Sequence, residues 1–200
     1  MVGSHEYGFQ VCNSTQSYIE RGRGALGTRI RKKLSGVLAT AALATVLVGV
    51  APAHAASTRA EYIGQVDPIC QASVAPINAA KTAYTRNYKR WIRGLSHGTL
   101  KSWVKQTGRT ARSLSQLNLA HAALTNQIAA VQPLTSDAGT IGTWLNDRRQ
   151  AEGFAASAAT AFSRFKFDRF DKQLRRAGTA DAAGVMAIAG FGFQVCGVSA

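Results

Sequence analysis

The most constraining feature of this 200-residue sequence is the spacing of its large apolar residues after position 58. They recur three, four or seven positions apart, which is the repeat of an α-helix that buries one face. The series Tyr84, Tyr88, Trp91 and Leu95 is one example. No alternating strand pattern and no Asn-Gly hairpin signal competes with this repeat. This part of the chain is therefore predicted to be all-α.

Start and stop signals divide the region into four predicted helices. The predicted helices span residues 58–95, 100–131, 136–174 and 179–196. The first begins at the capping-box pair Thr58 and Glu61, and Pro68 and Pro76 predict a kink or an interruption within it. Asp67, just before Pro68, is a second candidate helix start. Because short turns join the helices, we predict an up-down-up-down four-helix bundle.

A leader precedes these helices. A basic stretch from Arg21 to Lys33 is followed by the uncharged run Leu34–Val50 and then by the sequence APAHAAS. This order is typical of a secretory signal peptide, with Ala53 and Ala55 at the two specificity positions of the cleavage site. We therefore predict a signal peptide at residues 23–55, a helical bundle domain at residues 56–200, and a secreted or cell-envelope location. The alternative is an uncleaved membrane anchor, since the apolar run approaches the length of a transmembrane helix.

The pentapeptide GFQVC occurs twice, in YGFQVCNST at residues 7–15 and in FGFQVCGVS at residues 191–199. The first copy lies before the basic part of the leader, where a secreted protein seldom carries folded structure. We interpret residues 1–22 as an extension that is not native to the protein, joined in frame by a start site placed too early. Chance identity and a swapped structural element are the alternatives.

Two cysteines lie in the predicted mature chain, Cys70 and Cys196. In an oxidising compartment an even pair favours a disulfide, and two buried free thiols are the alternative. The predicted topology brings the start of the first helix and the end of the fourth to the same end of the bundle, where both cysteines lie. Their spacing excludes a redox CxxC motif and a haem-attachment CxxCH motif.

Both ends of the predicted mature chain resemble those of small uncharacterised exported proteins of actinobacteria. The matching stretches are RAEYIGQVDPIC at Arg59–Cys70 and GFGFQVCG at Gly190–Gly197. Those proteins are helical and carry one cysteine near each terminus. The resemblance implies a disulfide between Cys70 and Cys196, but it implies no activity.

The sequence carries no recognisable catalytic or metal-binding motif. The acidic residues form no E-x-x-H pattern of a di-iron bundle, and His97 and His121 belong to no zinc-binding motif. A G-x-S-x-G elbow and a phosphate-binding glycine loop are also absent from the sequence. We interpret His97 as a turn residue and His121 as a helix-face or interface residue. We therefore expect neither an enzyme nor a cofactor.

Charge is the one positive feature, because the predicted mature chain has 18 Lys and Arg against eight Asp and Glu. Eight of the cations flank the turn predicted near Gly98, and no Asp or Glu occurs between Asp67 and Asp137. We call them the hairpin cations: Arg86, Lys89, Arg90, Arg93, Lys101, Lys105, Arg109 and Arg112. We predict that they bind an anionic envelope polymer or a membrane surface, with nucleic acid less favoured. The alternative is a solvated face that keeps the bundle soluble.

Phenylalanines alternate with cations in FSRFKFDRFDKQLRR at residues 162–176, a pattern also found in single-strand nucleic-acid binders. Phe162 and Phe165 continue one helix stripe, whereas Phe167 and Phe170 fall on another. A bend near Lys166, with the two sets buried against different neighbours, explains this pattern by packing alone. The sequence thus predicts an exported, non-catalytic envelope binder, and the alternative function is a carrier of a small apolar or haem-like ligand between the helices.

Overall fold

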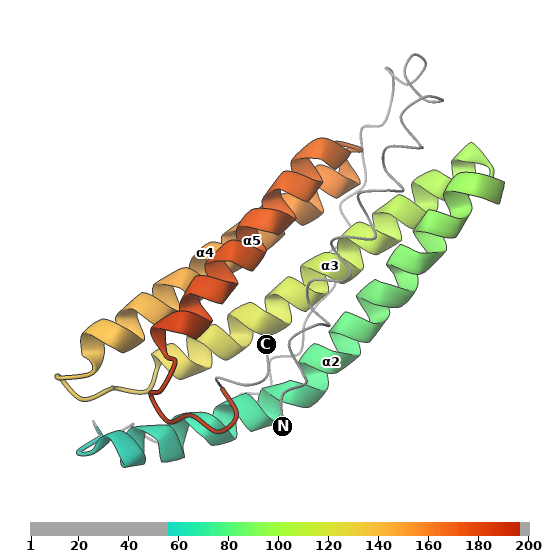
Figure 1. Cartoon of the computed structure of the whole chain (residues 1–200). Helices are drawn as coiled ribbons and strands as arrows, with labels where there is room; N and C mark the ends of the chain where they lie inside the picture. The colour runs from blue at the N-terminus through green and yellow to red at the C-terminus, as the bar shows by residue number, and fades with distance from the viewer. Residues whose placement is uncertain (1–55, 197–200) are drawn as a thin grey trace, which may run out of the picture. The chain divides into compact units, whose positions relative to one another are not determined.

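Four helices make up the described part of the computed structural model, residues 56–196 (Figure 1). They are α2 (Arg59–His97), α3 (Leu100–Ala129), α4 (Ala138–Ser163) and α5 (Phe167–Ala187). Each helix packs on the next along the chain. The predicted all-α, up-down-up-down bundle is confirmed, and so is the disulfide between Cys70 and Cys196. The predictions for residues 1–22 and for the signal peptide at residues 23–55 lie outside the described residues.

Helix α2 begins at the capping box that the sequence predicts. The Thr58 side chain accepts a hydrogen bond from the Glu61 backbone N–H at 3.1 Å, and the Glu61 carboxylate accepts one from the Ser57 N–H at 2.8 Å. Pro68 and Pro76 both lie inside the helix, which bends along its length in Figure 1 but is not interrupted. The prolines therefore produce a curved helix instead of a second helix start.

The boundary between the last two helices was predicted too late in the chain. Helix α4 ends at Ser163 and α5 begins at Phe167, whereas the sequence predicted one bent helix running on toward Leu174. Phe165 has a φ of 59°, and the Lys166 N–H donates to the Ala161 carbonyl at 2.9 Å. This left-handed residue and the long backbone bond are the features of a Schellman helix end, which glycine normally supplies.

Helix α5 also ends earlier than predicted, at Ala187 instead of near Cys196. Gly190 and Gly192 take φ values of 79° and 110°, which favour glycine and turn the chain away from the helix axis. The segment after α5, drawn in red in Figure 1, then lies against the first half of α2. This return path carries Cys196 to Cys70, with a Cα–Cα distance of 5.3 Å.

Asp67 holds the returning segment beside the disulfide. Its carboxylate accepts hydrogen bonds from three consecutive backbone N–H groups, those of Gln194 at 2.9 Å and of Val195 and Cys196 at 3.2 Å each. The interpretation of Asp67 as a helix start is therefore wrong, because the residue lies inside α2. Its side chain binds a segment more than 120 residues away in the sequence.

Two apolar clusters fill the bundle. One surrounds the disulfide and includes Tyr62 and Trp144. The other lies toward the α2–α3 and α4–α5 turns and contains Trp91, Phe162 and Phe170. Phe162 contacts Phe170 at a ring-centroid distance of 4.8 Å, so the two predicted phenylalanine stripes meet in one cluster. The prediction of separate neighbours is thus wrong for this pair.

Phe165 does not belong to the core that was predicted for it. Its side chain is 41% exposed, whereas that of Phe162 is 1% exposed. The early end of α4 explains the difference, because residue 165 no longer continues the buried helix stripe.

We expect Phe162→Ala to destabilise the protein by about 3–5 kcal/mol, the usual cost of emptying a buried phenylalanine site. Phe165→Ala should cost about 1 kcal/mol or less, because that ring is already partly in water. Urea unfolding of the two variants tests the assignment. Equal losses of unfolding free energy would contradict it.

We expect Asp67→Asn to lower the free energy of unfolding by about 1–3 kcal/mol, since it weakens three charge-assisted hydrogen bonds to backbone N–H groups. Asp147→Asn is the matched control, because no hydrogen bond of Asp147 is found within residues 56–196. Thermal or urea unfolding with the disulfide intact measures the difference. A loss no greater than that of the control would show that the carboxylate does not stabilise the returning segment.

Candidate anion-binding surface

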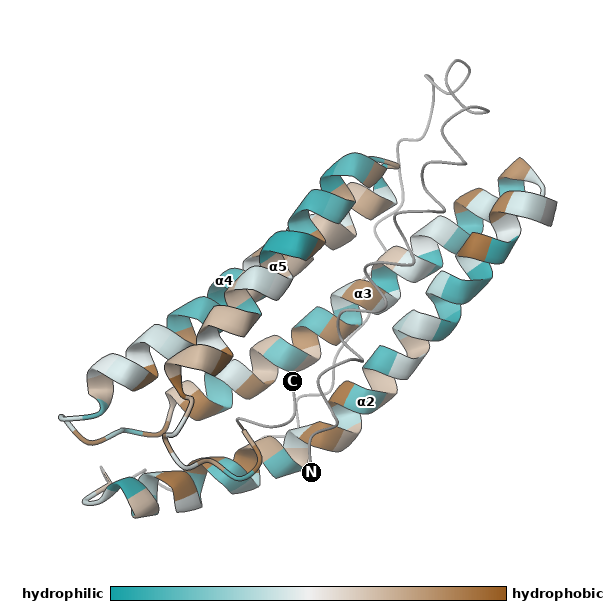
Figure 2. Cartoon of the chain, in the orientation of Figure 1, coloured by the Kyte–Doolittle hydropathy of each residue, from teal (hydrophilic) through white to brown (hydrophobic). Residues whose placement is uncertain are grey.

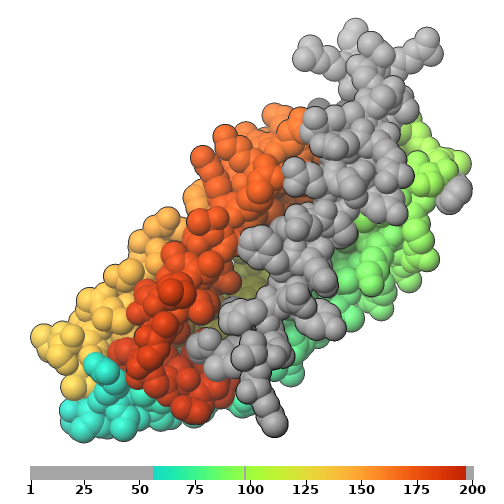
Figure 3. Space-filling model, in the orientation of Figure 1, coloured from blue at the N-terminus to red at the C-terminus, as the bar shows by residue number. Residues whose placement is uncertain are grey.

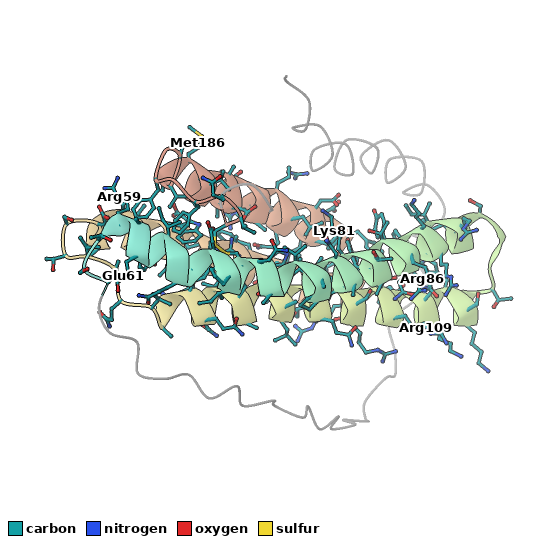
Figure 4. The ribbon with its side chains drawn as sticks, turned by 90° about the horizontal axis from the view of Figure 1, so that it is seen from below. Arg59, Glu61, Lys81, Arg86, Arg109 and Met186 are labelled. Carbon is teal, nitrogen blue, oxygen red and sulfur yellow. A yellow bond between two sulfur atoms is a disulfide. The ribbon has the colours of Figure 1, made fainter. Side chains whose placement is uncertain are left out.

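The hairpin cations lie on the second half of α2 and the first half of α3, on both sides of the turn at Gly98 and Thr99. All eight side chains are exposed. Figure 4 labels Arg86 on α2 and Arg109 on α3, and Figure 3 shows side chains of this hairpin, in green, at the molecular surface. The structure therefore places the predicted cations together around one end of a helical hairpin.

No acidic residue lies between Asp67 and Asp137 in the sequence, so the two helix ends at the α2–α3 turn carry cations alone. Within residues 56–196, none of the hairpin cations forms an ion pair, and the pair that is found joins Arg59 to Asp137 at 2.6 Å. That pair lies where α2 starts and α4 starts, and it lowers the pKa of Asp137 because the guanidinium donates hydrogen bonds to the carboxylate. The hairpin cations thus keep their hydrogen-bond donors available to a partner.

Two exposed leucines stand among these cations. Leu95 is 42% exposed near the end of α2, and Leu100 is 54% exposed at the start of α3. The sequence predicted that Leu95 belongs to the buried stripe, and this is wrong. The last buried aromatic residue of α2 is Trp91, and Leu95 lies one turn further along the helix, where its side chain is exposed. Figure 2 shows brown, hydrophobic residues near this hairpin end beside teal and white ones.

The α4–α5 turn lies next to the α2–α3 turn, which the sequence did not predict. Trp103 of α3 contacts Phe165 of the turn at a ring-centroid distance of 5.2 Å and Phe167 at 6.0 Å. Three further exposed cations are thereby added to the same end of the bundle. They are Arg164, Lys166 and Arg169, which line a groove of about 220 Å³ together with Ser157 and Thr160.

A polar belt separates the two apolar clusters inside the bundle. Arg148 of α4 is 8% exposed, and its Nε donates to the Thr125 hydroxyl of α3 at 3.0 Å. The Thr125 hydroxyl donates in turn to the Glu152 carboxylate. Among the described residues Arg148 has no carboxylate ion pair, and burial lowers its pKa. Burial of Arg148 was not predicted from the sequence, because an arginine in a helix usually lies on the surface.

His121 belongs to the same belt. Burial is the main cause that lowers the pKa of its imidazole, and Arg148 and Lys81 add to this effect while Asp181 opposes it. Each of the four helices therefore contributes an ionisable group near His121. The groups are Lys81 of α2, His121 itself in α3, Arg148 of α4 and Asp181 of α5. The interpretation of His121 as a helix-face or interface residue agrees with its half-buried position between helices; the side chain of His97 lies outside what is described.

The remaining features of residues 56–196 bear on metal binding, on membrane crossing and on a second groove. No group of His, Cys, Asp and Glu in residues 56–196 has the geometry to hold a metal ion. None of the described helices combines the length and apolar content needed to cross a bilayer. A groove of about 450 Å³ between α4 and α5 is open and lined by Lys172, Arg175 and Arg176, with Arg176 over the Phe154 ring. The carboxyl residue Asp147 and the small apolar residues Ala180 and Ala183 complete the lining, so the groove is mixed in character.

Comparison with known protein families, with curated proteins and with solved structures finds no match to this chain. The resemblance to exported actinobacterial proteins therefore stays a prediction.

The lowered pKa of His121 predicts a stability that depends on pH. Below its ordinary pKa of 6.5, the imidazole takes up a proton more readily in the unfolded chain than in the folded one. The free energy of unfolding should thus fall as the pH is lowered from 7 toward 5. His121→Gln should reduce this slope, and urea unfolding at several pH values measures it.

Lys81→Gln provides a graded comparison, because removing one of the cations that lowers the pKa should weaken the slope without abolishing it. An unchanged slope in His121→Gln would exclude this histidine as the titrating group.

Proposed function

We propose that this protein is exported and acts without catalysis, by binding a polyanionic component of the cell envelope through the hairpin cations. The observation that carries the proposal is that all eight cations are exposed and form no ion pair within residues 56–196, in a stretch of the sequence that has no acidic residue between Asp67 and Asp137. Several neighbouring cations create a positive potential that attracts polyanions and raises their association rate. Phosphate-rich polymers and anionic lipid headgroups both have the required charge.

Export is supported by two independent features. The leader at residues 23–55 has the order of a signal peptide, and a disulfide joins Cys70 to Cys196 in the folded domain. Structural disulfides form and persist in oxidising compartments and are rare in the cytosol. An exported bundle would meet the anionic polymers and lipids of the envelope directly.

A merely solvated face explains the hairpin less well. Solubility of a small domain needs a net charge of only about 2–8 in either direction, and mixed signs serve it best. The α2–α3 hairpin instead concentrates one sign, with Lys101, Lys105 and Arg109 spaced four residues apart on one helix face. Like charges at this spacing repel and destabilise a helix slightly. A binding role accounts for an arrangement that folding alone disfavours.

We expect the triple change Arg93→Glu, Lys101→Glu and Lys105→Glu to weaken binding to inorganic polyphosphate and to phosphatidylglycerol vesicles at low salt. Each cation near an anionic surface contributes about 1 kcal/mol, so affinity should fall by at least roughly a hundredfold. The thermal stability should change little, because exposed charges contribute little to folding. Co-sedimentation with vesicles and fluorescence anisotropy with labelled polyphosphate measure the two affinities.

The matched control is Arg149→Glu, Lys172→Glu and Arg175→Glu, three exposed cations on α4 and α5. It changes the net charge by the same amount but leaves the hairpin cations in place. We expect the control to lose much less affinity than the hairpin variant. Equal losses would attribute binding to net charge and would refute a role for the hairpin.

A further inference from the structure

We propose that the anionic partner is a lipid bilayer, and that Leu95, Leu100 and Phe165 insert into it while the surrounding cations bind its headgroups. We call these three side chains the apolar tip. This inference rests on the proposed function and deepens it, because it selects a membrane over a soluble polymer. It describes a protein that docks on a bilayer surface without crossing it.

The first observation is where the exposed apolar side chains lie. Five large apolar side chains are exposed in residues 56–196, and three of them form the apolar tip. Their exposed fractions are 42% for Leu95, 54% for Leu100 and 41% for Phe165. The other two, Leu119 and Met186, lie in the middle of α3 and at the last turn of α5. Exposed apolar groups gathered beside a basic surface are typical of proteins that bind membrane interfaces.

The second observation is that two turns, far apart in sequence, are joined into one end by aromatic contacts. Trp103 contacts Phe165, and Trp91 contacts Phe167 at 5.3 Å. Both tryptophans are buried beneath the turns, so the apolar tip stands on a packed base. A rigid base lowers the conformational entropy lost when exposed side chains enter a membrane.

The third observation is how the cations are placed around the apolar tip. Arg93 and Lys101 lie two positions and one position from the exposed leucines in sequence, while Arg164 and Lys166 flank Phe165 directly. The latter two also line the small groove that contains the hydroxyl residues Ser157 and Thr160. A cationic groove with hydroxyl groups beside an apolar side chain matches a phosphate headgroup joined to an acyl chain.

Other occupants fit this end less well. A second copy of the chain would bring a like-charged set of hairpin cations against the first, which costs free energy at any face-to-face contact. A hydrophilic polyanion satisfies the cations but leaves the apolar tip in water. An anionic bilayer meets both the charge and the apolar groups, so we select it.

The test compares binding to vesicles with binding to a lipid-free polyanion. We expect the triple change Leu95→Ser, Leu100→Ser and Phe165→Asn to lower affinity at least about tenfold for phosphatidylcholine vesicles in which about one third of the lipid is phosphatidylglycerol. Affinity for inorganic polyphosphate should stay unchanged. Asparagine is chosen at position 165 because it tolerates the positive φ found there. The control Leu119→Ser with Met186→Ser removes the two exposed apolar groups elsewhere and should leave both affinities unchanged.

A second readout detects insertion directly. Brominated lipids quench tryptophans that approach the acyl chains, and Trp103 lies beneath Phe165 at the proposed contact. We expect quenching in the wild-type protein, and less of it in Trp103→Phe and in the apolar-tip variant. Thermal unfolding confirms that each variant is folded.

The outcomes separate the inference from the proposed function. If the apolar-tip variant binds vesicles as tightly as wild type, or if wild type binds polyphosphate but not vesicles, the bilayer inference is overturned while polyanion binding stands. If charge reversal at the hairpin changes neither affinity, the proposed function fails as well.

Discussion

The segment that follows α5 returns to α2 and closes the bundle at one end, through the Cys70–Cys196 disulfide and the Asp67 carboxylate. Consecutive helices pack on one another, but α2 and α5, which would close the bundle, are not in comparable contact. The Cys70–Cys196 disulfide spans 126 residues, and in the chain-entropy model a loop of this length stabilises a fold by about 4–5 kcal/mol. The Asp67 carboxylate adds three hydrogen bonds at the same place. A covalent link and a charged side chain therefore add to the limited contact between α2 and α5, which includes the rings of Trp91 and Phe167.

The sequence predicted the features that local chemistry determines. Thr58 caps α2, and Pro133 follows the end of α3, so these boundaries could be read from residue types alone. The turn at residues 164–166 could not, since Phe165 occupies a left-handed position where glycine is usual. The role of Asp67 was equally hidden, because its partners are backbone N–H groups of a segment brought near only by the complete fold. Helix boundaries set by neighbouring residues were therefore predicted correctly, whereas the turn and the side-chain contacts that depend on long-range packing were missed.

The same distinction applies to the candidate site. Each hairpin cation was identified from helical spacing and the absence of acids, and each is exposed. The contribution of Arg164 and Lys166 was not anticipated, because the predicted helix continued through them. Only the early end of α4 turns these residues toward the end of the bundle where the α2–α3 turn also lies. The earlier end of α4 thus adds exposed cations and the partly exposed Phe165 to the end of the bundle that carries the hairpin cations.

Some of the hairpin cations lie where positive charge disfavours helix stability. Lys101 lies in the first turn of α3, where no acidic residue occurs and where the helix dipole disfavours positive charge. A set of cations placed only for helix stability would avoid the start of α3, yet the positive charge continues across the α2–α3 turn.

The buried contact of Trp91 with Phe162, at a ring-centroid distance of 4.9 Å, and the hydrogen bond from the Trp91 indole to Thr107 stabilise this end of the hairpin. The aromatic core therefore offsets an unfavourable surface charge, and the proposed binding role accounts for a placement that helix stability disfavours.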